Sequence, residues 1–157
     1  MKSILLLGSN LENPIQQLEL AKIKLKEIFG ELKESSIYKT AAWGNTNQSD
    51  FYNQAIHLET NMDPELFMKK LIDIEESMGR TRLNKWEPRI IDIDIIAMES
   101  AIIKEENLEV PHPHMQNRMF VLVPMLELSP DWIHPVFLKS ISTLITECKD
   151  ELAVTKI

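Results

Sequence analysis

The sequence predicts an α+β fold with a ferredoxin-like core, on the basis of two observations. Apolar segments of strand length lie at residues 3–7, 32–40, 53–60 and 91–96. Segments with apolar residues at helical spacing separate the first strand from the second and the third from the fourth. The resulting order, βαββαβ, is typical of an antiparallel sheet with helices packed on one face. We expect a C-terminal helical extension after this core.

The first strand and the first helix are defined by their boundaries. Residues 3–7 are followed by the polar residues 8–10, which predict a turn. Asn13 and Pro14 then predict a helix start, because Asn is a favoured N-cap and Pro is favoured at the first helical position. The helix is expected to end at Gly30. The polar turn could present backbone N–H groups to an anion, although a plain connecting turn is the simpler interpretation.

The middle of the chain contains the second and third strands and the second helix. The loop over residues 41–52 is, at about a dozen residues, longer than a hairpin turn requires, which indicates a functional or mobile segment. On the third strand, Asn53 and His57 are expected to face away from the core. Asp63 and Pro64 predict the start of the second helix by the same capping preferences.

The chain beyond the fourth strand predicts smaller elements. Residues 99–110 indicate a small hairpin. His112 and His114 follow in a segment stiffened by prolines, and a His-x-His pair can bind a transition metal only if further ligands join it. A short buried helix is expected over residues 121–128 and a final amphipathic helix over residues 138–148.

The composition predicts one globular domain over residues 1–157, with 44% hydrophobic and 26% charged residues. The 17 basic and 24 acidic residues give a net charge of −7, which argues against nucleic-acid binding. The single cysteine, Cys148, excludes an internal disulfide and fits a reducing compartment. The amino-terminal apolar run is too short for a signal peptide or a membrane span. We therefore expect a cytoplasmic protein without a membrane association. We also expect a monomer.

The segment 79–96 combines paired carboxylates with basic residues. On a strand, Asp92 and Asp94 share one face, with their Cα atoms roughly 6.5–7 Å apart at ~3.3 Å of rise per residue. Two ionised aspartates this close repel each other unless a cation lies between them, and Mg²⁺ or Mn²⁺ is the natural occupant for oxygen ligands. The basic residues upstream suit phosphate binding: Arg80, Arg82, Lys85 and Arg89. The pattern predicts a metal-assisted polyphosphate site, the alternative being an edge strand with a solvated, charged face.

Short motifs along nearly the whole chain are shared with a known enzyme family. The most specific is Pro88-Arg89-x-x-Asp92-x-Asp94. The weaker motifs occur in the right order: Leu7-Gly8-Ser9-Asn10-Leu11, Tyr38-Lys39-Thr40, Asp50-Phe51-Tyr52-Asn53, Gly79-Arg80-Thr81-Arg82, Val110-Pro111-His112 and Asn117-Arg118-Met119-Phe120. Together they resemble hydroxymethyl-dihydropterin pyrophosphokinase, which transfers a diphosphate from ATP to a pterin alcohol in folate biosynthesis.

The resemblance implies an ATP-dependent diphosphotransferase with ATP as co-substrate and two Mg²⁺ ions. Asp92 and Asp94 would be the metal ligands. Arg80 and Arg89 would hold the phosphates and spread the charge that develops during transfer. Further nucleotide-binding residues would be Arg82, Lys85, Trp86, Ile95, His112 and Arg118.

The resemblance also implies a pterin site. Phe51 and Phe120 would lie on the two faces of the flat ring. Thr40, Asn53 and main-chain groups near Trp43 would bind its amide edge, because an Asn side chain offers both a donor and an acceptor. For the two phenylalanines alone, packing in the core is the simpler interpretation.

Five positions depart from the pattern of this family: Ala41, Ala42, Lys85, Glu87 and Pro113. Lys85 stands where arginine is common, and lysine lacks the bidentate geometry of a guanidinium group toward phosphate. These departures bear on the rate and on nucleotide affinity, whereas the two aspartates and the pterin residues match the pattern.

Two other functions are compatible with parts of the sequence. A metal-dependent phosphohydrolase or nuclease could use the two aspartates, but it would need more carboxylate or histidine ligands, and a nuclease would need a basic track. A non-catalytic ferredoxin-like module that binds a small ligand would share the fold.

Overall fold

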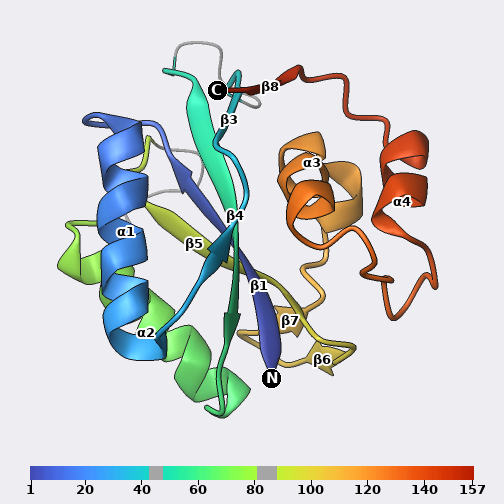
Figure 1. The fold of residues 1–157 in the computed structure, drawn as a ribbon, viewed down its shortest axis with the longest axis horizontal. Helices are drawn as coiled ribbons and strands as arrows, with labels where there is room; N and C mark the ends of the chain where they lie inside the picture. Colours follow the sequence, from blue (N-terminus) through green and yellow to red (C-terminus); the bar gives the residue numbers. More distant parts are fainter. Residues whose placement is uncertain (43–47, 81–87) are drawn as a thin grey trace.

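The computed structural model describes residues 1–42, 48–80 and 88–157 (Figure 1). Its main sheet has the strand order β5-β1-β4-β3-β8, with β2 also paired to β4, and all of these pairs are antiparallel. The strands are β1 (Lys2–Ser9), β2 (Lys33–Glu34), β3 (Tyr38–Thr40), β4 (Phe51–Glu59), β5 (Asp92–Met98) and β8 (Val154–Lys156). β6 (Ile103–Lys104) and β7 (Glu109–Val110) form the predicted hairpin. The predicted α+β core is confirmed.

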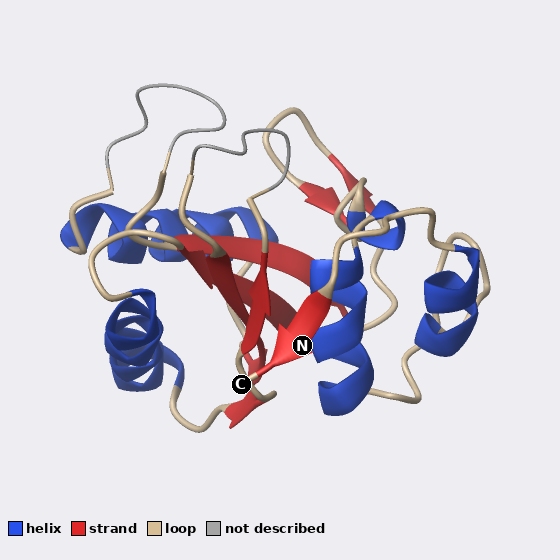
Figure 2. Cartoon of the chain, turned by 90° about the horizontal axis from the view of Figure 1, so that it is seen from above, coloured by secondary structure: helices blue, strands red, loops and turns tan. Residues whose placement is uncertain are grey.

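Helices cover both faces of the sheet, as Figures 1 and 2 show. They are α1 (Pro14–Phe29), α2 (Pro64–Ser77), α3 (Met119–Leu128) and α4 (Ile141–Glu147), with a 3-10 turn at Met115–Asn117. The first two pack on one face, as expected for the βαββαβ core. The C-terminal helix α3 packs on the other face, and α4 packs against α3.

Alternation along β1 divides the core into two layers, because successive side chains of a strand point to opposite faces. Leu5 and Leu7 are fully buried on the side of α1 and α2. Ile4 and Leu6 lie on the other side, in a cluster with Val121, Leu122 and Met125 of α3. The second layer holds α3 against this face of the sheet.

Both predicted helix starts are confirmed. The side chain of Asn13 accepts a hydrogen bond from the N–H of Gln16 at 3.4 Å, and that of Asp63 accepts one from the N–H of Glu65 at 3.0 Å. α1 ends at Gly30, whose φ of 81° is a conformation that glycine adopts without steric cost.

The single strand predicted over residues 32–40 is wrong, because the structure has two short strands there. The pairing with β4 shifts by one residue between β2 and β3, since residues 35–37 stand opposite only two residues of β4. Ser35 accepts a hydrogen bond at its Oγ from the N–H of Ala55 at 2.9 Å, in place of a regular ladder bond. This is a β-bulge, which a pattern of period two does not reveal.

The C-terminal helix is shorter than predicted, and an unpredicted strand follows it. Leu138 has a φ of 54°, which a right-handed helix excludes. The helix begins instead after Ser140, whose Oγ accepts a hydrogen bond from the N–H of Thr143 at 3.2 Å. After α4 the chain returns to the sheet, where β8 pairs with β3.

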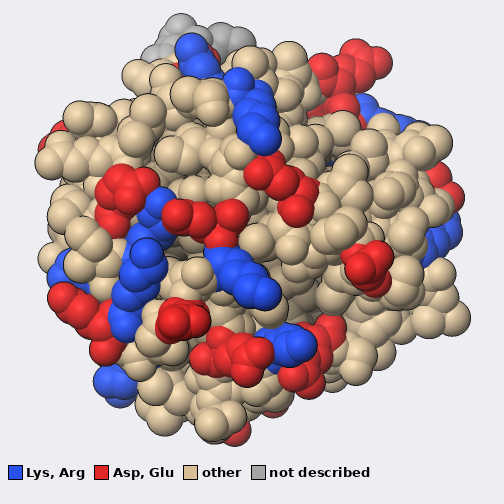
Figure 3. Space-filling view, in the orientation of Figure 1, with Lys and Arg blue, Asp and Glu red and all other residues tan. Residues whose placement is uncertain are grey.

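Acidic and basic side chains are interspersed on the face drawn in Figure 3, with no continuous basic surface among the described residues there. This mixed surface is consistent with the net charge of −7. In the described part of the chain, none of the helices has the length and apolar character needed to cross a membrane.

Candidate active site

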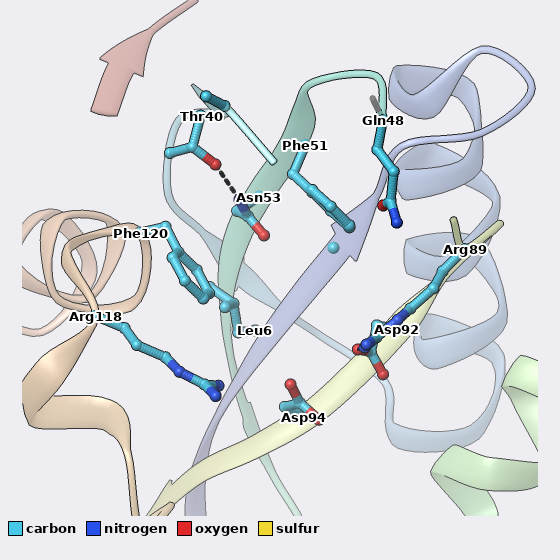
Figure 4. Close-up of a pocket in the computed structure, with 12 residues that line it drawn as sticks. Leu6, Thr40, Gln48, Phe51, Asn53, Arg89, Asp92, Asp94, Arg118 and Phe120 are labelled. Atoms are coloured by element: carbon cyan, nitrogen blue, oxygen red, sulfur yellow. Dashed lines mark hydrogen bonds and ion pairs between the residues drawn. The ribbon is translucent and has the colours of Figure 1, made fainter. Parts of the chain in front are cut away.

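Three neighbouring strands, β4, β1 and β5, form the floor of a first pocket. Gly8 on β1 stands opposite Asn53 on β4 and opposite Asp92 on β5, while Leu6 on β1 stands opposite Asp94. Directly paired residues point to the same face of a sheet. The strand register therefore places one amide and two carboxylates on a single surface, and all three line the pocket (Figure 4).

The walls of the first pocket come from β3, β4 and α3. Phe51 and Phe120 flank Asn53 in Figure 4, and the Nδ2 of Asn53 donates a hydrogen bond to the Oγ1 of Thr40 at 3.4 Å. Arg118 and Phe120 reach the pocket from the start of α3, with the guanidinium carbon of Arg118 5.7 Å from the centre of the Phe120 ring. The pocket thus combines aromatic walls with an amide and a charged floor.

A network of ion pairs surrounds Asp92. The Nη1 of Arg80 lies 2.6 Å from one carboxylate oxygen of Asp92 and also pairs with Glu75, while Arg89 pairs with the other oxygen of Asp92. Glu75 is only 2% exposed and accepts a further hydrogen bond from the backbone N–H of Ile93 at 2.7 Å. The carboxylates of Asp92 and Glu75 therefore hold the guanidinium groups of Arg80 and Arg89 in place beside the aspartate pair.

The aspartate pair has the electrostatics of a cation site. Burial raises the pKa of Asp94 well above its ordinary value, and the negative charges of Asp92 and Glu75 raise it further, against the opposing effect of Arg89 and Arg80. A divalent cation would offset this repulsion. The donors fit Mg²⁺, which commonly takes one or two carboxylates together with substrate phosphates and water. No cluster of three or more His, Cys, Asp or Glu side chains suited to a metal exists among the described residues.

A second pocket adjoins the first and shares its charged end. Four residues line both pockets: Arg89, Asp92, Asp94 and Arg118. Arg80, Ile95 and His112 line the second pocket, together with the turn between β6 and β7. The two pockets thus meet at the aspartate pair, which is the arrangement that transfer of a group between two substrates requires.

His112 is held in its neutral form in the second pocket. Burial lowers the pKa of His112 to about 4, and the positive charges of Arg118 and His114 contribute to the same effect. Its Nδ1 accepts a hydrogen bond from the backbone N–H of His114 at 3.2 Å. The imidazole therefore adds no positive charge to this pocket near neutral pH.

Every predicted site residue that the structure describes lines one of the two pockets. Thr40, Phe51, Asn53 and Phe120 line the first, Arg80, Ile95 and His112 line the second, and Arg89, Asp92, Asp94 and Arg118 line both. Of the family departures, Ala41 lines the first pocket and Pro113 the second. Six residues named in the sequence analysis lie outside the described residues: Trp43, Thr81, Arg82, Lys85, Trp86 and Glu87.

Comparison with known proteins identifies the family. The model of the 7,8-dihydro-6-hydroxymethylpterin-pyrophosphokinase (HPPK) family matches residues 4–130. The chain belongs to the HPPK family. A 2-amino-4-hydroxy-6-hydroxymethyldihydropteridine pyrophosphokinase of Aquifex aeolicus is 38% identical over 133 residues, covering 85% of this chain and 83% of that protein. The protein of the same name from Haemophilus influenzae is 36% identical over 149 residues, covering 94% and 90%.

Solved structures show the same fold. The crystal structure of wild-type Plasmodium falciparum HPPK-DHPS with STZ-DHP superposes with a TM-score of 0.76 at 17% sequence identity. The match covers 93% of this chain but only 43% of that one, so the chain spans less than half the length of this larger protein.

Glu75 is a residue of this HPPK-family site that the sequence reasoning missed. The sequence contained a signal for a buried Glu75, because this residue follows Phe67 and Leu71 at intervals of four. It therefore lies on the buried side of α2. A buried carboxylate on an apolar helix face needs a cationic or hydrogen-bonding partner. Arg80 and the N–H of Ile93 are those partners.

The polar turn predicted at residues 8–10 is wrong in its position, because Gly8 and Ser9 continue β1. The N–H of Asn10, which was considered for anion binding, instead donates to the carbonyl of Arg89 at 3.1 Å. The side chain of Asn10 accepts from the N–H of Arg89 at 2.8 Å and donates to the carbonyl of Ser49 at 3.3 Å. Asn10 therefore joins the segments that lead to Arg89 and Phe51 in the HPPK-family site.

On the prediction that Asn53 binds the pterin, replacing Gly8 with alanine is expected to raise the KM for the pterin about tenfold, because small displacements of a binding group are costly. A Cβ at Gly8 would lie 3.0 Å from the Oδ1 of Asn53 and would push that amide aside. The backbone of Gly8 does not have a positive φ, so alanine should leave β1 intact. Steady-state kinetics with varied pterin would measure the effect.

A double-mutant cycle with Asn53→Ala tests whether Gly8→Ala acts by displacing the amide of Asn53. Once the amide has been removed, Gly8→Ala should have little further effect on the KM for the pterin, because the two changes act on one contact. Additive effects would contradict this explanation.

Proposed function

We propose that the chain transfers the diphosphate of ATP to the hydroxymethyl group of 6-hydroxymethyl-7,8-dihydropterin, with the first pocket as the pterin site and the second as the nucleotide site. As a member of the HPPK family, the chain is an ATP-dependent diphosphotransferase of folate biosynthesis. The single observation that carries the assignment of the pockets is that they meet at Asp92 and Asp94.

The first pocket suits a flat, polar heterocycle. Phe51 and Phe120 supply aromatic faces for stacking, and Asn53 supplies both a donor and an acceptor for the amide edge. Thr40 orients this amide through its hydrogen bond with Asn53. Bound in this way, the pterin would direct its hydroxymethyl group toward the aspartate pair.

The second pocket suits the nucleotide. Arg80, Arg89 and Arg118 would bind the phosphates, and Ile95 and the neutral His112 would line the remainder of the nucleotide site. We propose that residues 1–157 act as one domain and as a monomer.

The reaction requires attack by the hydroxymethyl oxygen on the β-phosphorus of ATP. The bond from this phosphorus to the oxygen that bridges to the α-phosphate breaks, the hydroxyl releases its proton to solvent, and AMP leaves. Asp92 and Asp94 would hold two Mg²⁺ ions, which supply charge neutralisation and orientation of the phosphates. Arg80 and Arg89 stand where negative charge develops, and the ion pairs with Asp92 hold them there in advance.

The two alternatives fit the site less well. A phosphohydrolase would not use the aromatic pocket that contains Asn53. The face in Figure 3 lacks the basic track of a nuclease. A binding module would not need two guanidinium groups paired to a carboxylate between two pockets.

Release of AMP from ATP in the presence of Mg²⁺ tests the proposal, measured with and without 6-hydroxymethyl-7,8-dihydropterin. We expect AMP only when the pterin is present. ADP or phosphate formed regardless of the pterin would indicate a hydrolase, and the absence of any product would indicate a binding module.

A further inference from the structure

The start of α3 places Phe120 and the preceding residue, Arg118, in the first pocket, yet the helix has no N-cap side chain of its own. Arg118, the residue before the helix, makes no capping hydrogen bond with its side chain, and no acidic residue lies in the first turn of this described helix. The first N–H groups of a helix need partners from elsewhere. Met119, which lies between the two pocket residues, presents the first of these N–H groups.

Asp150, which is 31 residues further along the chain, supplies the missing partner. One of its carboxylate oxygens accepts a hydrogen bond from the N–H of Met119 at 2.9 Å. The other accepts one from the N–H of Leu152 at 3.1 Å, which fixes the direction of the carboxylate through a local turn. The negative charge also lies at the N-terminal end of α3, where the helix dipole favours an anion.

The segment that contains Asp150 also supports the opposite wall of the first pocket. Val154 of β8 stands opposite Thr40 of β3. The Nζ of Lys156 lies 3.5 Å from the carboxylate of Glu127 near the end of α3, and Glu127 accepts a hydrogen bond from the N–H of Ser36 at 3.0 Å. Figure 1 shows this part of the chain leaving α4 and ending beside β3. Residues 150–156 therefore join α3 to β3, the elements that hold Phe120 and Thr40.

We propose that Asp150 is a positioning residue for the pterin. By capping Met119, it holds the first turn of α3 so that Phe120 and Arg118 point into the first pocket. Asp150 itself lines neither pocket, so it acts through the helix rather than by contact with a substrate. This inference rests on the proposed function of the first pocket.

The test compares Asp150→Ala with Asp150→Asn and with Asp63→Ala. Asp150→Ala should raise the KM for the pterin about fivefold to tenfold, the size of effect expected for loss of a helix cap. It should also speed amide hydrogen exchange at residues 119–122 by a similar factor, with kcat changed less than about threefold. Asp150→Asn keeps an acceptor for the N–H of Met119 and should recover most of the affinity.

Asp63→Ala is the matched control, because it removes the same type of cap from α2, at the end remote from Glu75. It should speed exchange at the start of α2 and leave the KM for the pterin unchanged. A general loss of stability would affect both variants alike, whereas positioning affects only Asp150→Ala.

The proposal is overturned if Asp150→Ala binds the pterin as wild type does, or if Asp63→Ala raises the KM equally. Should Asp150→Ala fail to fold, Asp150→Asn and the exchange at residues 119–122 provide the same comparison, and a wild-type KM despite faster exchange would also overturn it. If the wild-type protein itself releases no AMP with the pterin, the proposed function fails instead, and the exchange data still show whether Asp150 caps α3.

Discussion

Replacing Asp92 with alanine is expected to lower kcat by a factor of about a thousand or more, because metal-ion charge stabilisation is worth several kcal/mol. The change removes one of the two proposed Mg²⁺ ligands and the carboxylate that holds Arg80 and Arg89. The melting temperature should change by no more than about 5 °C, since Arg80 keeps its pairing with Glu75. Pterin-dependent AMP release and a thermal melt measure the two quantities.

The control for Asp92→Ala is Asp73→Ala. Asp73 is exposed on α2, so its replacement changes the net charge equally without touching the site. Its activity should stay close to that of wild type. If Asp92→Ala retained more than about a tenth of the wild-type kcat, the contribution of Asp92 would be below ~1.4 kcal/mol and the proposed metal role would be wrong.

Arg89→Ala is expected to lower kcat about 10²–10³-fold, as is typical when one donor to developing negative charge is removed. The affinity for the pterin should change little, because Asn53 and the two phenylalanines provide that site. Arg89→Lys should fall between wild type and Arg89→Ala, because lysine retains the charge but not the planar fork. Single-turnover kinetics and equilibrium binding of the pterin separate these effects.

Lys26→Ala serves as the control for Arg89→Ala, because Lys26 is an exposed cation in the last turn of α1. Its kcat should match that of wild type. An Arg89→Lys variant with full activity would show that only the positive charge is needed. A large rise in the KM for the pterin in Arg89→Ala would show that Arg89 binds the pterin rather than the phosphates.

The structure brings predicted site residues together where a strand pattern sets the geometry. Asp92 and Asp94 share a face because residues two apart on a strand always do. Asn53 joins them because β4 pairs with β1 in the register that sets it opposite Gly8. The pairing itself was not predictable from the periodicity of one strand.

Elements that depend on contacts between distant segments were missed or misplaced. The bulge at Ser35 depends on a hydrogen bond from Ala55, and β8 depends on an open edge of β3. Glu75 acquires its role only because Arg80 and Ile93 fold back onto α2. None of these partners lies within one helical turn of the residue it meets.

The sequence by itself determined the βαββαβ order of the core, the helix starts at Asn13 and Asp63, and the common face of the two aspartates. These features follow from periodicity and capping, which act over a few neighbouring residues. Only the tertiary structure decided that Asp150 caps α3 and that one carboxylate holds both Arg80 and Arg89. Asp150 meets a residue 31 positions away, and Arg80 and Arg89 reach Asp92 from positions before β5 that lie outside any helix or strand. The geometry of these contacts is set by how the segments pack rather than by any periodic pattern.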